Sequence, residues 1–388
     1  MGRPAAIGGA PLLANGFRPF FLGAALWLGA ASWFWAAAPL APMPEELADP
    51  RWHARELLFG GIGGILAGFL LTAVPNWTRR LPVRGRPLLA LFLPWALARL
   101  LAPFPAVAPL AVLVEIGFYA ALAGLLWREI IAGRNWRNLP VLVLVTLFAL
   151  AAPLSRPQWT ESPATGEAAL PIGLASILLL LALIGGRITP SFTRNWLAKR
   201  GERALPAPFG ALDRAALAAW AVALAGWLVL PQQASGPMFL VAGTLHLLRL
   251  ARWRGHRTLG EPLVLVLHLG YLWLGLGALL FGAALWGLGW DAATALHALT
   301  MGAIGTMTLA VMTRAALGHS GRPLRADGWT VMIYALVTIA TLARLAVPWW
   351  GEEARLTAAL LWGGAYLLFA LRYLPILASP RLPASTRR

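Results

Sequence analysis

Long apolar segments follow one another along almost the whole chain, and they constrain its fold more than any other feature. Several of them reach about 20 residues, the length an α-helix needs to cross the roughly 30 Å hydrocarbon layer of a bilayer. Only 12% of the residues are charged, whereas a soluble protein would carry about a quarter. The sequence therefore predicts an all-α polytopic membrane protein, in which residues 1–388 form a single integral membrane domain.

The apolar segments predict twelve membrane-spanning helices. The expected spans are residues 17–38, 54–77, 86–103, 107–131, 138–154, 168–187, 212–230, 235–253, 261–287, 292–317, 328–347 and 354–375. The first 16 residues lack the layout of a signal peptide, and the first apolar run is too long to be the core of one. We therefore expect that run to remain as the first span.

Basic residues are distributed unevenly between the loops. The loops after even-numbered spans are rich in arginine, whereas the other loops contain only Arg51, Arg156 and Arg355 together with several acids. Cytoplasmic loops carry the excess of Lys and Arg in membrane proteins, so both termini are predicted to face the cytoplasm of a bacterial inner membrane. The net charge of +17 is spread over these loops rather than along one face, which argues against a nucleic-acid partner.

Short motifs recur at fixed helix positions. Spans 2, 6 and 10 each end in a Thr-Arg step, and the steps are 115 and 120 residues apart: Thr78-Arg79, Thr193-Arg194 and Thr313-Arg314. Further matches link the first and third parts of the chain: Gly85-Arg-Pro-Leu88 with Gly321-Arg-Pro-Leu324, and His53-Ala54 with His297-Ala298. Repeats of this kind predict three four-helix units, at about 17–131, 138–253 and 261–375, in a pseudo-threefold arrangement.

Two histidines are the main candidates for a cofactor site. His53 and His297 each open a helix that runs inward from the outer face, so we expect them at similar depth. Two neutral imidazoles on facing helices are a usual axial pair for a six-coordinate haem b. The alternative is that each is an interfacial histidine bonded to a carbonyl. Glu56 lies on the same helical face as His53, where it would orient the imidazole or carry a proton.

Two buried arginines are expected near that level. Arg99 in the third span and Glu115 in the fourth lie at similar depth, which predicts a buried ion pair. Arg344 is the repeat mate of Arg99. Because arginine commonly pairs with carboxylates, both arginines are candidate cofactor-binding residues, and Arg344 is the candidate for holding haem propionates.

The chain has no cysteine, so any metal must be held by His, Met, Tyr or a carboxylate. His246 and His268 are expected at comparable depth on the cytoplasmic side, as ligands of copper or a second haem, or as a structural hydrogen-bond pair. His319 is either a further ligand or a turn residue between two glycines. Met307 and Met312 are candidate ligands because thioether suits Cu(I), although membrane methionines mostly just pack.

Several segments together resemble the NnrS family of bacterial membrane proteins. They are Asn15-Gly-Phe-Arg-Pro-Phe-Phe21, Trp52-His53, the run from Gly68 to Trp77, the run from Gly186 to Asn195, Leu267-His268-Leu-Gly-Tyr271 and the stretch 297–324. The resemblance implies a twelve-span protein with haem and copper, and a link to nitric oxide metabolism or protection against nitrosative stress. The family commonly reads His-x-His-Glu where this chain has His53-Ala-Arg55-Glu56, which puts a metal site using the second His in doubt.

The layout is also similar to that of the haem-copper oxidase catalytic subunit, in which a low-spin haem hangs between helices 2 and 10. His53 and His297 fall on those helices, but the oxidase's copper-binding histidines on helices 6 and 7 have no match here. Oxygen or nitric oxide reduction therefore does not follow from this fold-level analogy. The competing hypothesis is a haem-free transporter or channel, with Glu56, Glu115 and the buried arginines lining a path.

Overall fold

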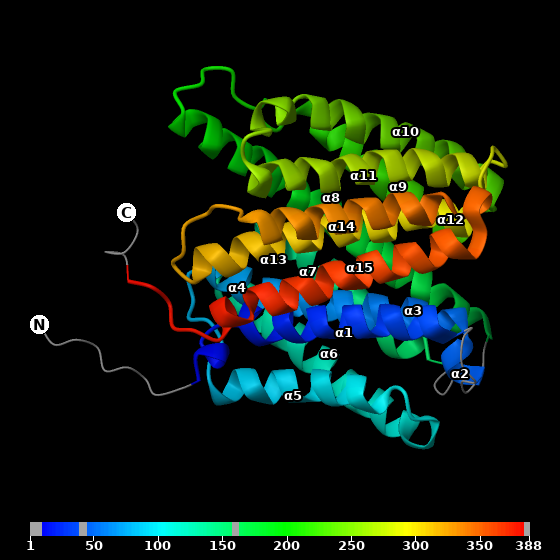
Figure 1. Ribbon diagram of the computed structural model, residues 1–388, viewed down its shortest axis with the longest axis horizontal. Coiled ribbons are helices and arrows are strands. Elements are labelled where there is room, and N and C mark those ends of the chain that lie inside the picture. The colour runs from blue at the N-terminus through cyan, green and yellow to red at the C-terminus, as the bar shows by residue number, and fades with distance from the viewer. Residues whose placement is uncertain (1–9, 39–44, 157–162, 384–388) are drawn as a thin grey trace, which may run out of the picture.

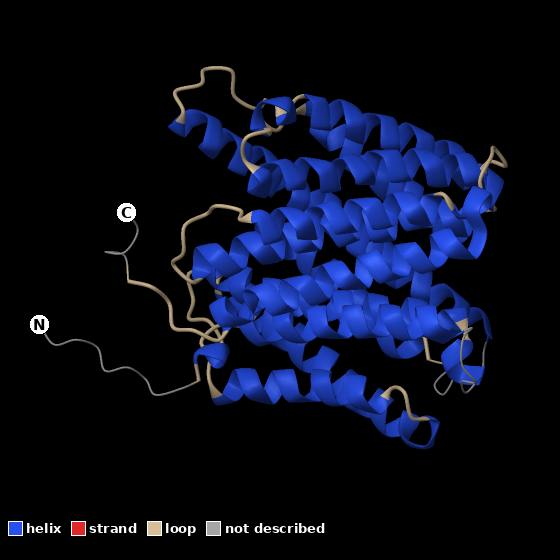
Figure 2. Ribbon diagram, viewed as in Figure 1, coloured by secondary structure: helices blue, strands red, loops and turns tan. Residues whose placement is uncertain are grey.

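The computed structural model describes residues 10–38, 45–156 and 163–383. Within these ranges the chain consists of helices and loops, and no strand is present (Figure 2). The long helices lie roughly side by side along one direction, as Figure 1 shows. The prediction of an all-α fold with long apolar helices is confirmed.

The helices follow the apolar segments closely. In the first part of the chain they are α1 (Phe17–Ala37), α2 (Glu45–Ala48), α3 (Pro50–Arg55), a π-helical segment (Glu56–Ile62), α4 (Gly63–Thr78), α5 (Arg86–Leu101), α6 (Ala108–Ala132) and α7 (Leu139–Leu154). The second part contains α8 (Pro163–Lys199), α9 (Ala211–Val229), α10 (Gln232–Ala251), α11 (Pro262–Leu285), α12 (Ala292–His297), a second π-helical segment (Ala298–Gly305), α13 (Thr306–His319), α14 (Gly328–Leu345) and α15 (Val347–Leu377).

Eleven helical segments in the described ranges are long and apolar enough to cross a bilayer. The twelfth expected span, α5, has 16 residues, a length of about 24 Å at 1.5 Å per residue. Arg18 near the start of α1 donates from Nη1 to the carbonyls of Leu377 and Ser379, each at 2.6 Å, so α1 begins where α15 ends. The chain therefore crosses the bundle an even number of times, which counts α5 as a crossing.

One helix is longer than the sequence predicted. Helix α8 continues to Lys199 rather than ending near residue 187, and Thr193 inside the extension donates to the Thr189 carbonyl. Helix α15 is interrupted at Gly351, which has φ 57°, and the long segment after this break matches the predicted span 354–375. A positive φ of this kind favours glycine, which has no Cβ to clash with the backbone.

Close helix contacts rest on glycine. Gly236 of α10 and Gly282 of α11 face each other, and a Cβ on either would lie 2.8 Å from the other's carbonyl oxygen. Small residues let membrane helices approach closely. The first and last long helices, α1 and α15, also pack extensively against each other, as do α14 and α15 (Figure 1).

The three Thr-Arg steps share one local structure. Thr78, Thr193 and Thr313 are buried, and each hydroxyl donates to the carbonyl four residues earlier, at 2.9, 2.8 and 2.9 Å. The three threonines therefore make the same hydrogen bond near the ends of their helices, which agrees with a repeat. The division into three four-helix units stays a prediction.

Candidate functional site

The two predicted haem-binding histidines lie on short helices of matching design. Helix α3 is capped by Asp49, which accepts from the Arg51 amide at 2.7 Å. Helix α12 is capped by Asp291, which accepts from the Thr294 amide at 2.8 Å. Each short helix passes directly into a π-helical segment, a rare geometry that often marks functional positions.

His297 has a defined hydrogen-bonding state. Its Nδ1 lies 2.6 Å from the carbonyl oxygen of Ala293. A carbonyl oxygen only accepts, so Nδ1 must carry the proton and Nε2 keeps its lone pair. Metal-bound histidines usually donate their second ring nitrogen to a carbonyl or carboxylate in this way.

His53 lies within electrostatic range of His297. Its ring stacks on Trp35, with centroids 5.0 Å apart and an interplanar angle of 27°. The two imidazoles are near enough to interact electrostatically, and Arg344 and Arg355 lie within reach of His53 as well. The Nδ1 of His53 is buried and has no hydrogen-bond partner. The structure thus brings together the two histidines that the repeat had paired.

Arg344 lies beside both histidines. Its guanidinium donates from Nη1 to the hydroxyl of Thr294 at 3.2 Å, on the same short helix as His297. It also interacts electrostatically with His53 and His297. The carboxylate of Asp291, the cap of the same short helix, also interacts electrostatically with Arg344 but makes no ion pair with it.

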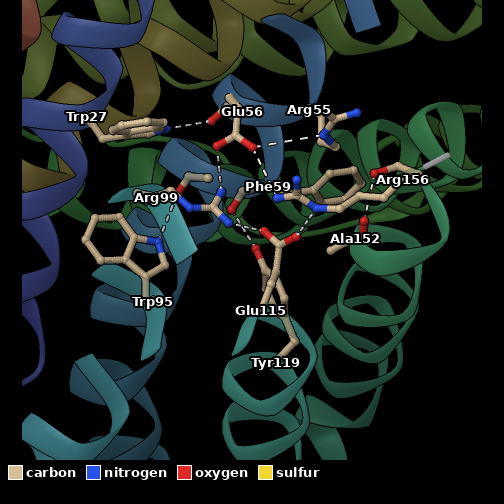
Figure 3. A network of polar contacts seen from close by, with 12 residues as sticks. Trp27, Arg55, Glu56, Phe59, Trp95, Arg99, Glu115, Tyr119, Ala152 and Arg156 are labelled. Carbon is tan, nitrogen blue, oxygen red and sulfur yellow. Dashed lines mark hydrogen bonds and ion pairs between the residues drawn. The ribbon is translucent and has the colours of Figure 1, made fainter. Parts of the chain in front are cut away.

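Arg99 and Glu56 belong to a separate, fully buried ion network (Figure 3). Arg99 pairs with Glu56 at 3.0 Å and with Glu115. Arg156 pairs with the same two carboxylates, at 3.2 Å to Glu56 and 2.8 Å to Glu115. The predicted ion pair between Arg99 and Glu115 is therefore present. Both carboxyl oxygens of Glu56 face arginines rather than the imidazole of His53.

Three side chains bind the first π-helical segment through its carbonyls. Trp27 donates to the Glu56 carbonyl at 3.3 Å, Tyr119 to the Phe59 carbonyl at 2.6 Å, and Trp95 to the Gly60 carbonyl at 2.9 Å (Figure 3). These donors come from α1, α6 and α5. The segment after His53 is thus held on three sides, and the ion network fixes its first residue.

Comparison with family models gives one match, the NnrS protein family, over residues 11–381. The chain belongs to the NnrS family. A search of curated proteins gives no match. Membership of the NnrS family fits a role related to nitric oxide in general, and the apolar helices support a membrane location.

Arg55 stands where NnrS sequences commonly have a second histidine, and it extends the ion network. Its Nε lies 4.0 Å from Glu56 and makes no hydrogen bond, and the residue is buried. At this position the chain therefore has a buried cation beside the carboxylate of Glu56.

The histidines predicted on the cytoplasmic side have different partners. His246 Nδ1 lies 2.9 Å from the Tyr271 hydroxyl, and its buried Nε2 has no partner. His268 Nε2 lies 2.8 Å from the Thr193 hydroxyl, and its Nδ1 is buried without a partner. The two imidazoles are not hydrogen-bonded to each other, so a direct structural pair between them is absent.

The other predicted metal ligands are dispersed. Helix α13 runs through His319, whose exposed ring lies 5.7 Å from that of Phe17. Met307 and Met312 are buried, and a Cβ on Gly185 would lie 3.3 Å from the Met307 methyl. Within the described ranges, no group of three or more His, Asp or Glu side chains is close enough to hold a metal ion.

Sequence reasoning missed several residues of this region. Arg156 was visible only as one of the few cations in the outer loops, and it follows the end of α7 directly. Tyr119 and Trp95 looked like ordinary apolar-face residues. The π-helical segments have no signal in the sequence beyond the glycines at 60, 61, 302 and 305.

Proposed function

We propose that this NnrS protein is a haem protein of nitric oxide metabolism or nitrosative-stress protection, with one haem b held by His53 and His297. The observation that carries the proposal is that these two imidazoles lie within electrostatic range of each other, on matching short helices. From the distribution of basic residues between the loops, we further propose that both termini face the cytoplasm of the inner membrane. The haem would then lie near the outer face.

The ring nitrogens fit axial ligation of a haem iron. The proton on His297 Nδ1 is fixed by the Ala293 carbonyl, which leaves Nε2 as a ligand. His53 has a buried nitrogen without a hydrogen-bond partner, and an unsatisfied buried nitrogen costs about 1–3 kcal/mol. Burying a second polar partner or a ligand against this ring would remove that cost.

Arg344 fits the acidic edge of a haem. It lies beside both histidines with a single hydrogen bond, to the neutral hydroxyl of Thr294. A propionate would add a direct ion pair to this guanidinium, because guanidinium and carboxylate form short charge-assisted hydrogen bonds. Arg99 is not part of this proposal, since Glu56 and Glu115 already occupy its guanidinium.

A bound haem would supply an iron that exchanges one electron and interacts with diatomic ligands. The chain's own residues have the other tasks. Ala293 fixes the tautomer of His297, and Trp35 fixes the plane of the His53 ring. Arg344 would neutralise a propionate and so orient the macrocycle.

Copper stays a prediction from the resemblance alone. His246 and His268 each retain one buried nitrogen without a partner, which is the feature that favours a ligand role. Their present hydrogen bonds go to Tyr271 and Thr193, and Met307, Met312 and His319 make other contacts. The proposed function does not involve copper.

A haem-free transporter or channel is the competing function. It would need Glu56, Glu115 and the buried arginines to line an accessible path. These side chains are instead paired with one another and almost completely shielded from solvent. A closed ion network of this kind favours a structural role, so the haem proposal is preferred.

The test is the absorption spectrum of purified protein. Wild type is expected to show a Soret band, and both His53→Ala and His297→Ala are expected to lose it. His256→Ala is the matched control because His256 is an exposed loop residue. A colourless wild type that still protects cells from nitric oxide would overturn the proposal.

A further inference from the structure

An apolar cavity of about 90 Å³ lies where α4, α8 and α13 meet, the three helices that bear the Thr-Arg steps. All three contribute to the walls: Leu66 comes from α4, Leu181 and Ile184 come from α8, and Met307 and Val311 come from α13. The cavity therefore lies at the junction of the three predicted repeat units and not inside one of them.

The cavity walls present no free polar group with which a water molecule could form a hydrogen bond. Thr308 supplies the only hydroxyl in its walls, and that group is already engaged. Its oxygen lies 2.8 Å from the Ile304 carbonyl and 2.8 Å from the Tyr366 hydroxyl. Buried water needs two to four polar partners, and cavities lined by Leu, Ile and Phe stay dry.

Size restricts what fits in the cavity. An apolar cavity of about 150 Å³ takes benzene or xenon, so the smaller space here suits a molecule of two or three heavy atoms. Gly185 keeps the space open, because a side chain at this position would project toward the Met307 methyl.

The outer end of the cavity points toward the histidine pair. Ile62 and Ile304 line it, and they lie at the ends of the two π-helical segments. His53 and His297 are nine and seven residues earlier on the same two helices, a rise on the order of 10 Å. A molecule in the cavity is thus close to the proposed haem on its membrane-interior side.

We propose that this cavity takes up a small uncharged diatomic gas from the bilayer and holds it on the inner side of the histidine pair. The assignment of that gas as nitric oxide rests on the proposed function, but uptake of a small apolar molecule does not. Such molecules favour an apolar phase over water, so the membrane itself would deliver them to the cavity.

Xenon tests the cavity directly, because it is small, apolar and visible by anomalous scattering. Crystals of the full-length protein under xenon pressure are expected to show a peak between Leu66, Leu181 and Met307. Val311→Phe is expected to reduce its occupancy at least fivefold by filling the space, and Ile184→Phe provides a second filling variant from the opposite wall. Val241→Phe is the matched control, because Val241 is an exposed residue of α10.

Ordered water or a lipid chain in the cavity, or xenon bound only elsewhere, would overturn the proposal. The Soret band of Val311→Phe and of Ile184→Phe is expected to match that of wild type, which separates filling of the cavity from loss of the haem. If the protein contains no haem, the proposed function fails while the xenon experiment still decides the cavity.

Discussion

The carboxylate of Glu56 lies 3.0 Å from the guanidinium of Arg99, and both side chains are almost completely buried. Glu56 is also the first residue of the π-helical segment that follows His53. The ion network therefore anchors the backbone next to the proposed haem ligand. The charges of this network have a structural role, so removing one of them should lower the stability of the folded protein.

Arg99→Met is expected to lower the stability of the protein strongly. Removing one partner of a buried pair leaves an uncompensated charge, which costs about 3–5 kcal/mol. Thermal unfolding in detergent should show a clear fall in Tm. The control is Arg257→Met, which breaks the exposed pair with Glu202, and exposed pairs contribute only about 0–1 kcal/mol.

A double variant separates charge balance from packing. Arg156→Met combined with Glu115→Gln removes one cation and one anion, so the net charge of the network, Arg55 included, is unchanged and the pair of Arg99 and Glu56 remains. We expect it to be more stable than either single variant. If its loss equalled the sum of the single losses, the network would not be acting as a coupled unit.

Glycine 61 is expected to tolerate no side chain. A Cβ there would lie 2.1 Å from Cδ2 of Leu28, which is fully buried and has no room to move. Overpacking of this kind costs about 1–3 kcal/mol, so Gly61→Ala should lower Tm and weaken haem retention. Gly117→Ala on α6 meets open space and should be neutral or slightly stabilising. Equal behaviour of the two variants would contradict the close packing of α1 on the π-helical segment.

The cap of the helix bearing His297 should make stability fall at acid pH. Burial alone would raise the pKa of Asp291, but hydrogen bonds from Thr294 and the charge of Arg344 outweigh it and lower the pKa. Because the pKa of Asp291 is lower in the folded protein than in the unfolded chain, ionised Asp291 stabilises the folded protein at pH values above its unfolded pKa of about 4. This stabilisation is lost as the pH falls through the pKa of Asp291 in the folded protein. Asp291→Asn keeps a capping side chain without the titration, so the gap in Tm between wild type and variant should close below about pH 4. A gap that stays constant down to pH 3 would contradict this role.

Much of the architecture was predictable because the bilayer imposes its length on each helix. Apolar runs such as 17–38 and 292–317 match α1 and the α12–α13 segment within a few residues. The predicted end of α8 was wrong, since polar residues at the membrane surface continue a helix without any hydropathy signal. Contacts between residues far apart in the sequence, such as that of Thr193 with His268, leave no trace in hydrophobic periodicity.

The candidate site was predictable only in part. The repeat pointed to His53 and His297 as a pair, and helix depth pointed to Arg99 and Glu115. Sequence spacing also put Glu56 on the face of His53, but its carboxylate pairs with Arg99 and Arg156, which come from distant helices. Partners from distant spans, such as Tyr119 and Arg156, depend on tertiary packing that one sequence does not encode locally.

Haem content per polypeptide tests the central proposal most directly. Protein purified from haem-replete cells would be quantified for haem b in wild type, His53→Ala, His297→Ala and the His256→Ala control at equal monodispersity. The proposed site predicts one haem per chain in wild type and in His256→Ala, and less than about a tenth of that in either of the other variants. Full haem content in both His53→Ala and His297→Ala, or none in wild type, would contradict it.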